Sequence, residues 1–212
     1  MKVRTETRRT AIVETAAGVF LDLGYEGASM KEVSIRLGGS KATLYGYFSS
    51  KEALFIAVVQ MYATSHLYNA VADLVVEPGI SVNLEESLLK FGRNMLKIVM
   101  NDSTAIKVYR MVLAESGRSD IGTLFYQSGP SQSIDALATL MSASVENGAL
   151  SKANPRVLAK QFLSLLTAEV DERLFQQDPK PMTLAQIDQL VATAVDMFLR
   201  GALLTVSPRC TG

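Results

Sequence analysis

The sequence has very little of the chemistry that disulfides and metal sites need. Its 212 residues include one cysteine, Cys210, and one histidine, His66. A single cysteine cannot form an internal disulfide, and no ligand spacing typical of a metal site accompanies it. We therefore expect no metal, no cofactor and a reducing, cytoplasmic compartment.

The same scarcity argues against an enzyme. Nucleophilic catalysis requires a serine or cysteine beside a histidine and an acidic residue. His66 is the only histidine, Cys210 lies in the C-terminal tail, and the chain has no glycine-rich phosphate-binding loop. We expect no catalytic residues, and an enzyme or small-molecule carrier is the least favoured alternative.

Long hydrophobic runs are missing as well. Apolar residues make up 48% of the chain, enough for a large buried core, yet no run is long enough to cross a bilayer. The segment Met1–Arg9 is basic, but no apolar stretch follows it, so a secretory signal is not expected. We predict a protein that does not use a membrane as a partner.

The formal net charge is zero, and this average hides an uneven distribution. Residues 1–51 contain eight Lys and Arg against five Asp and Glu, a net charge of +3, whereas residues 52–212 contain 13 against 16, a net charge of −3. A basic end on an acidic body is typical of a DNA-binding protein with a separate second domain. An imbalance of three charges also arises by chance, so this support is weak.

Apolar residues recur with the period of an α-helix over nearly the whole chain, and no strand hairpin or repeat is convincing. Ile12, Ala16 and Phe20 share one face of a first helix, which Gly24 is expected to end. Ser49 or Ser50 is expected to cap the fourth helix, Asn154-Pro155 to start a long helix, and Thr183 to cap the last one, and glycine or proline breaks divide the rest of the chain. Further helices are expected at about residues 29–37, 40–48, 51–74, 83–100, 103–116, 119–148 with a break at Gly129-Pro130, 155–176 and 183–204.

Residues 27–51 are the most informative stretch. Ser29 with Glu32 forms a capping-box pattern for one short helix, Gly38-Gly39 makes a turn, and Ser40 caps a second short helix. In a helix-turn-helix, the first helix positions the second so that its front end enters the major groove of DNA. This arrangement requires apolar inward positions and hydrogen-bonding outward positions.

Both requirements are met. The expected inward residues are Val33, Leu37, Leu44 and Phe48, and the expected outward residues are Lys41, Thr43, Tyr45 and Tyr47, beside the small Ala42. Ser29, Ser40 and Lys51 mark helix N-termini, which bind phosphate through free amide groups. An ordinary helical hairpin with surface tyrosines is the alternative, but a plain surface avoids two exposed aromatic rings on one short helix.

Two sets of residues occur at a recognisable spacing. The first is Ile12, Ala16-Ala17, Phe20, Gly24-Tyr25, Ser29-Met30, Thr43-Leu44-Tyr45, Phe48 and Ser50-Lys51-Glu52, and the second is Leu113-Ala114-Glu115-Ser116, the segment 125–130 and Gln161-Phe162. Through the first set, residues 8–60 resemble the DNA-binding domain of the TetR/AcrR family of bacterial transcriptional regulators. Through the second, residues 112–175 are similar, more loosely, to the AefR-like C-terminal domain.

The resemblance implies roles for the helix-turn-helix residues. Lys31 occupies a position that contacts a base in some members, and Lys41, Ala42 and Thr43 lie where the recognition helix meets base edges. Tyr45 and Tyr47 match positions that touch phosphates and sugars, and Lys51 matches a phosphate-anchoring lysine. Arg4, Arg8 and Arg9 are expected to form a flexible arm on the DNA backbone or minor groove, or simply a solvated tail.

Two residues depart from the family pattern. Gly39 replaces an aliphatic residue that pins the turn onto the three-helix core, and its loss costs roughly 1–2 kcal/mol of apolar burial. Ser34 replaces the usual alanine, and we expect its hydroxyl to bond back to the Met30 carbonyl.

Useful DNA specificity requires two half-sites and therefore a dimer. The helix at 155–176 is apolar on more than one face, and the helix at 183–204 adds further apolar residues. The resemblance implies that these two helices pair with a second copy as a four-helix bundle. Simple burial of both helices is the alternative. The resemblance also implies an effector pocket between the fourth and seventh helices, with a candidate lining of Met61, Tyr62, His66, Met95, Tyr109, Phe125 and Tyr126.

The sequence therefore predicts an all-α protein with a three-helix helix-turn-helix domain at 1–50 and an effector-binding and dimerisation domain at 51–212. The expected function is a dimeric transcriptional regulator, most simply a repressor, that releases double-stranded DNA when a small apolar effector binds. A regulator without a small-molecule effector, either constitutive or gated by a partner, stays open as the main alternative.

Overall fold

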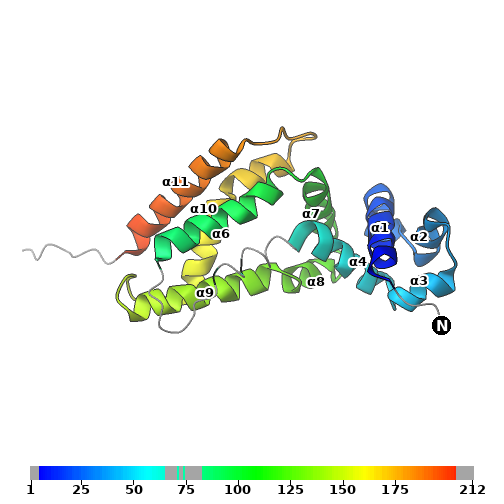
Figure 1. Cartoon of the computed structure of the whole chain (residues 1–212), viewed down its shortest axis with the longest axis horizontal. Coiled ribbons are helices and arrows are strands. Elements are labelled where there is room, and N and C mark those ends of the chain that lie inside the picture. Colours follow the sequence, from blue (N-terminus) through cyan, green and yellow to red (C-terminus); the bar gives the residue numbers. More distant parts are fainter. Residues whose placement is uncertain (1–4, 65–70, 72–73, 75–82, 204–212) are drawn as a thin grey trace, which may run out of the picture. The chain divides into compact units, whose positions relative to one another are not determined.

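The computed structural model describes residues 5–64, 71, 74 and 83–203 (Figure 1). The fold is all-α, as predicted, and the described residues add to the helices an isolated bridge between Leu150 and Leu203. The helices are α1 (Glu6–Gly27), α2 (Met30–Leu37), α3 (Lys41–Tyr47), α4 (Lys51–Val59), the π-helical turn η1 (Gln60–Thr64), α6 (Leu84–Val99), α7 (Ser103–Glu115), α8 (Ile121–Gln127), α9 (Pro130–Glu146), α10 (Pro155–Leu174) and α11 (Leu184–Ala202).

The chain forms two compact units. One comprises residues 1–65 and 102–130, and the other comprises residues 66–101 and 131–212. The first unit is larger than the predicted DNA-binding domain at 1–50 because residues of α4, α7 and α8 share a core with α1, α2 and α3. This packing does not test which residues bind DNA, so the functional division at residue 50 stays a prediction.

An aromatic cluster holds the first unit together. The rings of Phe20, Tyr25 and Phe55 meet with centroid separations of 5.0 to 5.8 Å, and all three side chains are buried. Tyr25 reaches this cluster because Gly24, with φ 70° and ψ 169°, breaks α1 one residue earlier. Only glycine adopts that backbone conformation without strain. The predicted break at Gly24 is therefore present, but α1 resumes after it and ends at Gly27, three residues beyond the predicted end.

Side-chain caps start most of the helices where the sequence placed them. Ser29, Ser40 and Ser50 each accept a hydrogen bond from the backbone N–H three residues on, at 3.1 Å. Of the two candidate caps for α4, the structure selects Ser50 over Ser49. The capping box predicted at Ser29 is only half formed. The Ser29 side chain accepts from the Glu32 backbone N–H, but the Glu32 carboxylate accepts from Arg36 instead of from the Ser29 backbone.

The fourth helix departs from its predicted course. The pattern predicted one helix over 51–74, whereas α4 ends at Val59 and continues as the π-helical turn η1 through Thr64. A π-turn contains one more residue per turn than an α-helix. Apolar periodicity over a few residues does not distinguish the two. Residues 65–70 lie outside the described residues.

The second unit has its own core. Helices α6, α10 and α11 pack against one another, and α9 contributes Ile134, Leu137 and Met141 to the same buried cluster (Figure 1). Asn154 and Thr183 cap α10 and α11 as predicted, and Thr183 forms a complete capping box with Gln186. The break at Gly129-Pro130 separates α8 from α9, and α10 ends at Leu174, two residues before the expected end.

Gly38 and Gly39 generate a paired prediction on thermal stability. Gly38 caps α2 with φ 67°, a left-handed conformation that a β-branched residue adopts only with strain. Gly39 has no positive φ, and the nearest atom to an added Cβ is the tip of the flexible Arg8 side chain, at 3.2 Å. We expect Gly39→Val to raise the free energy of unfolding by about 1 kcal/mol and Gly38→Val to lower it by about 1–2 kcal/mol.

Differential scanning calorimetry of both variants checks this pair. The gain at Gly39 corresponds to an increase in Tm of roughly 2–4 °C. A lower Tm for Gly39→Val would show that this turn is placed wrongly.

Gly92 generates a second prediction, on the core of the other unit. An added Cβ there would lie 2.8 Å from Val191 Cγ1 and 3.0 Å from Leu166 Cδ1, so α6 must separate from α10 and α11 to accommodate it. We expect Gly92→Ala to destabilise by about 1–3 kcal/mol. Gly201 in α11 is the matched control, because its added Cβ meets nothing within 4 Å and alanine there favours the helix. A higher free energy of unfolding in urea for Gly92→Ala than for wild type would contradict this packing.

Candidate nucleic-acid interface

The inner face of α3 is fixed in the core of the first unit. Leu44 is fully buried and Phe48 is 5% exposed, and they pack in the same cluster as Val33 of α2. Leu37 is partly buried against this cluster. The four residues predicted to point inward therefore do so, and the orientation of α3 follows from their packing.

The outer face of α3 is open to solvent. Lys41, Ala42, Thr43 and Tyr45 are exposed, and the tyrosine retains 51% of its accessible surface. The Thr43 and Ser40 hydroxyl oxygens lie 2.9 Å apart in a hydrogen bond, which restricts the threonine rotamer. A short helix with a fixed back and polar exposed front has the geometry that major-groove recognition requires.

Tyr47 differs from the other predicted contacts. Its side chain is half-buried, and its hydroxyl oxygen accepts a hydrogen bond from the Thr5 backbone N–H at 3.2 Å. Thr5 caps α1, and its side chain accepts from the Arg8 N–H. Tyr47 therefore ties the start of α1 to the end of α3, and it keeps its own hydroxyl proton for donation to a phosphate.

Lys51 is also engaged within the protein. Its Nζ donates to the Tyr25 carbonyl oxygen at 3.0 Å and lies 4.1 Å from the centroid of the Tyr25 ring. The Tyr25 hydroxyl donates to Glu52 at 3.3 Å. Burial, followed by the Glu52 charge, raises the pKa of Tyr25, whereas the Glu52 backbone N–H and the Ser50 hydroxyl lower the pKa of Glu52. An ammonium group has three protons, so Lys51 can still contact a phosphate while it holds Tyr25.

Ser34 corrects one expectation. Its hydroxyl donates to the Gly39 carbonyl at 2.7 Å and not to the Met30 carbonyl. The turn at Gly38-Gly39 brings the Gly39 carbonyl close to α2, where it replaces the Met30 carbonyl as the acceptor for the Ser34 hydroxyl. The serine therefore stabilises the turn instead of bending the helix.

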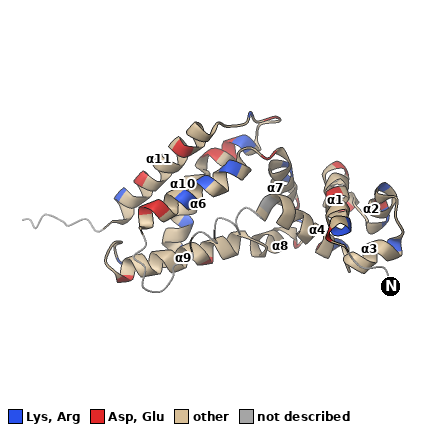
Figure 2. Cartoon of the chain, in the orientation of Figure 1, with Lys and Arg blue, Asp and Glu red and all other residues tan. Residues whose placement is uncertain are grey.

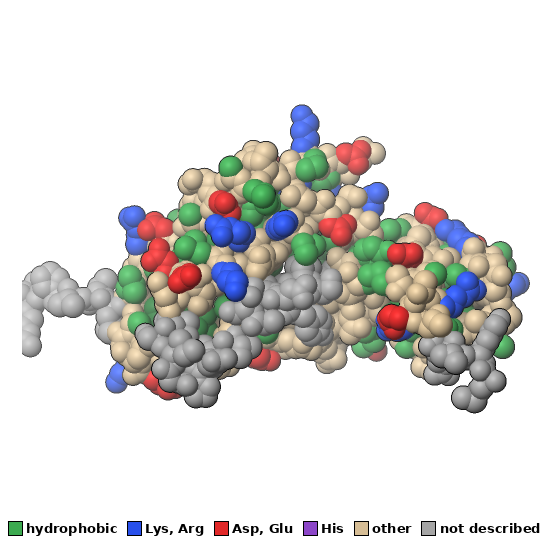
Figure 3. Space-filling model, viewed as in Figure 1, with side chains coloured by type: hydrophobic (Ala, Val, Ile, Leu, Met, Phe, Trp, Pro, Cys, Tyr) green, Lys and Arg blue, Asp and Glu red, His purple; other side chains and the backbone are tan. Residues whose placement is uncertain are grey.

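The cations of the helix-turn-helix fall into two groups. Arg9 pairs with Glu6, and Arg36 pairs with both Asp22 and Glu32. Arg8, Lys31 and Lys41 have no carboxylate partner within the residues that the structure describes. Figures 2 and 3 show charges of both signs interspersed on the molecule.

The predicted effector-lining residues are divided between the two units and the part of the chain that is not described. Met61, Tyr62, Tyr109, Phe125 and Tyr126 belong to the first unit, where the Tyr109 and Phe125 rings are 5.4 Å apart. Met95 is buried in the core of the second unit, and His66 lies outside the described residues. The effector site stays a prediction.

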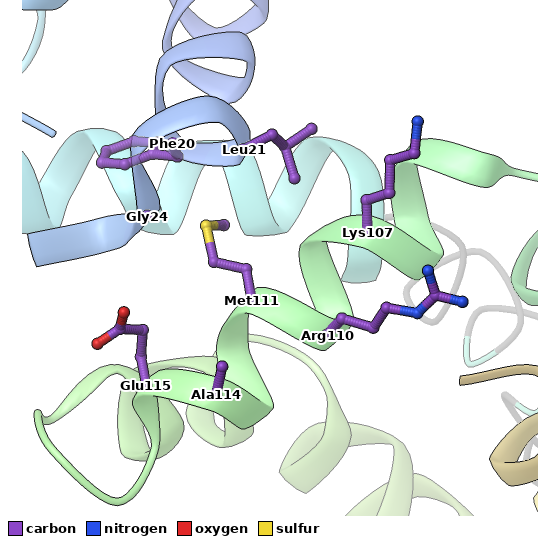
Figure 4. A pocket seen from close by; sticks show the side chains of 8 residues that line it. All are labelled: Phe20, Leu21, Gly24, Lys107, Arg110, Met111, Ala114 and Glu115. Atoms are coloured by element: carbon purple, nitrogen blue, oxygen red, sulfur yellow. The ribbon is translucent and has the colours of Figure 1, made fainter. Parts of the chain in front are cut away.

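An open pocket of about 390 Å³ lies between α1 and α7, and none of the seven predicted residues borders it. Its lining is Phe20, Leu21, Gly24, Lys107, Arg110, Met111, Ala114 and Glu115. Figure 4 shows Met111 directed toward the α1 residues, with Glu115 at one end and Lys107 and Arg110 at the other. This pocket depends on the break at Gly24, which the sequence indicated. It also depends on the packing of α7 against α1, which the sequence did not indicate.

The helices predicted to dimerise each contribute to the core of the second unit and leave other apolar side chains exposed. Phe162 and Phe198 are buried within 5.4 Å of each other, measured between ring centroids. Val157 and Met197 keep 49% and 58% of their surface, and Phe175, just after α10, keeps 91%. A single chain does not show whether these exposed apolar side chains meet a second copy, so dimerisation through α10 and α11 stays a prediction.

Features of other protein classes are absent from the described part of the chain. No helix there combines the length and apolar content needed to cross a bilayer. No group of three or more His, Cys, Asp or Glu side chains there could hold a metal ion.

Two family models match the chain. Residues 12–58 match the model described as "Bacterial regulatory proteins, tetR family", and residues 86–201 match the "AefR-like transcriptional repressor, C-terminal domain". The first match contains the helix-turn-helix, and the second covers more than half of the chain.

Curated relatives are similar over a part of the chain. The chain is 44% identical over 57 residues to the transcriptional activator FasR of Mycolicibacterium smegmatis, covering 27% of this chain and 26% of that protein. It is 34% identical over 73 residues to the transcriptional repressor AcnR of Corynebacterium diphtheriae, covering 34% and 36% of the two chains. The alignments thus span about a quarter to a third of the length of these relatives.

Solved structures are similar over the whole chain. The flavonoid-responsive regulator FrrA is 30% identical with a TM-score of 0.72, covering 97% of this chain and all of that one. A TetR-family regulator from Mesorhizobium loti has a TM-score of 0.75 at 23% identity, covering 95% of this chain and 100% of the other, and shows the shared fold.

The engaged Lys51 and the unpaired Lys41 generate a prediction on stability. Lys51→Met removes a hydrogen bond and a cation–π contact, so we expect the free energy of unfolding to fall by about 1–2 kcal/mol. Lys41→Met removes a solvated cation, so we expect a change within about 0.5 kcal/mol. Urea unfolding of both variants measures the difference, and equal stabilities would mean that the Lys51–Tyr25 contact contributes nothing.

Proposed function

The chain belongs to the TetR family of bacterial transcriptional regulators, and from that premise we propose that it is a dimeric, effector-responsive repressor. The carrying observation is the presentation of α3: its apolar side is locked in the core while Lys41, Ala42, Thr43 and Tyr45 are exposed. In this proposal Lys41, Ala42 and Thr43 meet base edges in the major groove.

The remaining predicted contacts surround α3 and hold the DNA backbone. Ser29 and Ser40 are exposed caps, Tyr45 reaches outward, and Tyr47 and Lys51 keep donor protons beyond those that they use within the protein. Lys31 is exposed and has no carboxylate partner among the described residues. We propose that these side chains contact phosphates and sugars of the DNA backbone, and that Lys31 also contacts a base.

Dimerisation supplies the second half-site. A single recognition helix contacts few base pairs, and two such helices one DNA turn apart, roughly 34–36 Å, read a symmetric operator. We propose that α10 and α11 form the dimer surface, supported by the exposed apolar side chains Val157 and Met197 and by the matched C-terminal family domain.

The response to an effector rests on relatives rather than on a described cavity. FrrA, which is similar over the full length, is named as flavonoid-responsive, and this supports a small, largely apolar effector. The effector's binding free energy need differ by only a few kcal/mol between the DNA-bound and released states of the protein to switch operator occupancy. The match to an AefR-like repressor domain supports repression, whereas the similarity to the activator FasR covers only 27% of this chain.

Selection of duplex DNA from a random pool by the purified protein tests the proposal. We expect a palindromic site, a gel shift that weakens as salt increases, and one protein dimer per site by analytical ultracentrifugation. Thermal-shift screening with flavonoid-like and other apolar compounds then tests the effector. Operator binding that no compound alters would favour the alternative of a constitutive or partner-gated regulator.

Lys41 generates a prediction specific to DNA. We expect Lys41→Ala to weaken binding of the selected duplex roughly 5- to 150-fold, equivalent to about 1–3 kcal/mol, and to relax base preference at one position of each half-site. Lys97→Ala is the matched control, because Lys97 is an exposed lysine of α6 in the other unit. Fluorescence anisotropy at fixed salt provides both values. Equal weakening by the two variants would indicate only a general charge effect.

A further inference from the structure

The backbone of Arg8 is held in place at the start of α1, although the sequence pattern places this residue in a flexible basic arm. It lies in the first turn of α1, where the Thr5 side chain accepts its backbone N–H at 3.3 Å. Thr5 is itself bonded to the Tyr47 hydroxyl at the end of α3. The backbone of Arg8 is therefore tied to the recognition helix.

The side chain of Arg8 reaches the helix-turn-helix turn. Its Nη2 atom lies 3.2 Å from the position that a Cβ of residue 39 would occupy. Residue 39 immediately precedes Ser40, the cap of α3. The guanidinium thus lies beside the end of α3 from which the exposed residues Lys41, Ala42 and Thr43 project.

Gly39 provides the space for this contact. Its backbone has no positive φ, so the turn does not require glycine there for conformational reasons. A valine there would place its Cβ 3.2 Å from Arg8 Nη2, closer than an ordinary van der Waals contact, so the guanidinium must shift to accommodate the side chain. The glycine that weakens the turn is therefore the residue that admits the arginine.

Arg8 also differs from its neighbour in charge pairing. Arg9 pairs with Glu6 and lies 5.2 Å from the centroid of the Phe48 ring, whereas Arg8 has no carboxylate partner in the described residues. A guanidinium has five N–H donors and binds phosphate oxygens in a fork geometry. We propose that Arg8 is an additional DNA phosphate contact and that Gly39 sets DNA affinity by admitting it. This inference rests on the proposed DNA-binding function.

Salt titrations of DNA binding test the contact. Wild type, Arg8→Gln and the control Lys97→Gln, at an exposed lysine of the other unit, are titrated by anisotropy against one duplex that wild type selects from a random pool. Each lost phosphate contact lowers the slope of log K against log salt by about 0.9, so Arg8→Gln in a dimer should lose roughly 2 and bind at least tenfold more weakly at about 0.1 M salt. Lys97→Gln should keep the wild-type slope, and Arg8→Lys should retain most of it.

Gly39→Val tests the coupling. Alone, it should reduce affinity and slope as Arg8→Gln does, while raising Tm. In the Arg8→Gln background, it should cause no further loss of affinity, because the two changes remove the same contact. A further loss there would show that valine disturbs the turn itself, and this would overturn the assigned role of Gly39.

The outcomes separate the two levels of the argument. If wild type shows no salt-dependent binding to any duplex, the proposed function fails. If wild type binds and Arg8→Gln leaves affinity and slope unchanged, only the Arg8 contact fails. Thermal unfolding of each variant confirms folding, and Arg8→Ala, which also removes the guanidinium, is the second removal variant if glutamine lowers stability.

Discussion

The burial of Leu44 and Phe48 is the constraint on which the rest of this structure depends. A helix of seven residues, such as α3, has no independent stability in water, so its orientation must come from packing. Leu44 is fully buried, and the cluster that receives it is built from α1, α2 and α4. The exposed polar side of α3 is the geometric consequence, and every functional assignment in the first unit starts from it.

The surrounding contacts make that orientation rigid. Tyr47 joins α3 to the start of α1, Ser34 joins α2 to the turn, and Lys51 joins α4 to the chain just after Gly24. Several of these groups are also candidate DNA contacts. Residues that position α3 and residues that bind DNA therefore overlap, so stability and DNA binding must be measured separately for each variant.

Local chemistry explains what the sequence could predict. Serine, asparagine and threonine caps bond to amides two or three residues away, and glycine breaks act at their own position, so Ser29, Ser40, Asn154 and Gly24 were assigned correctly. The contacts of Lys51 with Tyr25, of Arg8 with Gly39 and of Ser34 with the Gly39 carbonyl depend on how helices and turns meet in space. The π-turn η1 was missed because its apolar pattern resembles that of an α-helix, and the effector lining was assigned from resemblance alone.

Hydrogen exchange of the full-length protein, measured with and without a duplex that it selects, tests the central claim most directly. If α3 enters the DNA groove, the amides at the start of α3 and the cap residues around Ser29 and Ser50 should exchange more slowly in the complex. The core amides of α6 and α11 should be unaffected by direct contact. Protection confined to other helices, with no change between residues 29 and 51, would contradict the account.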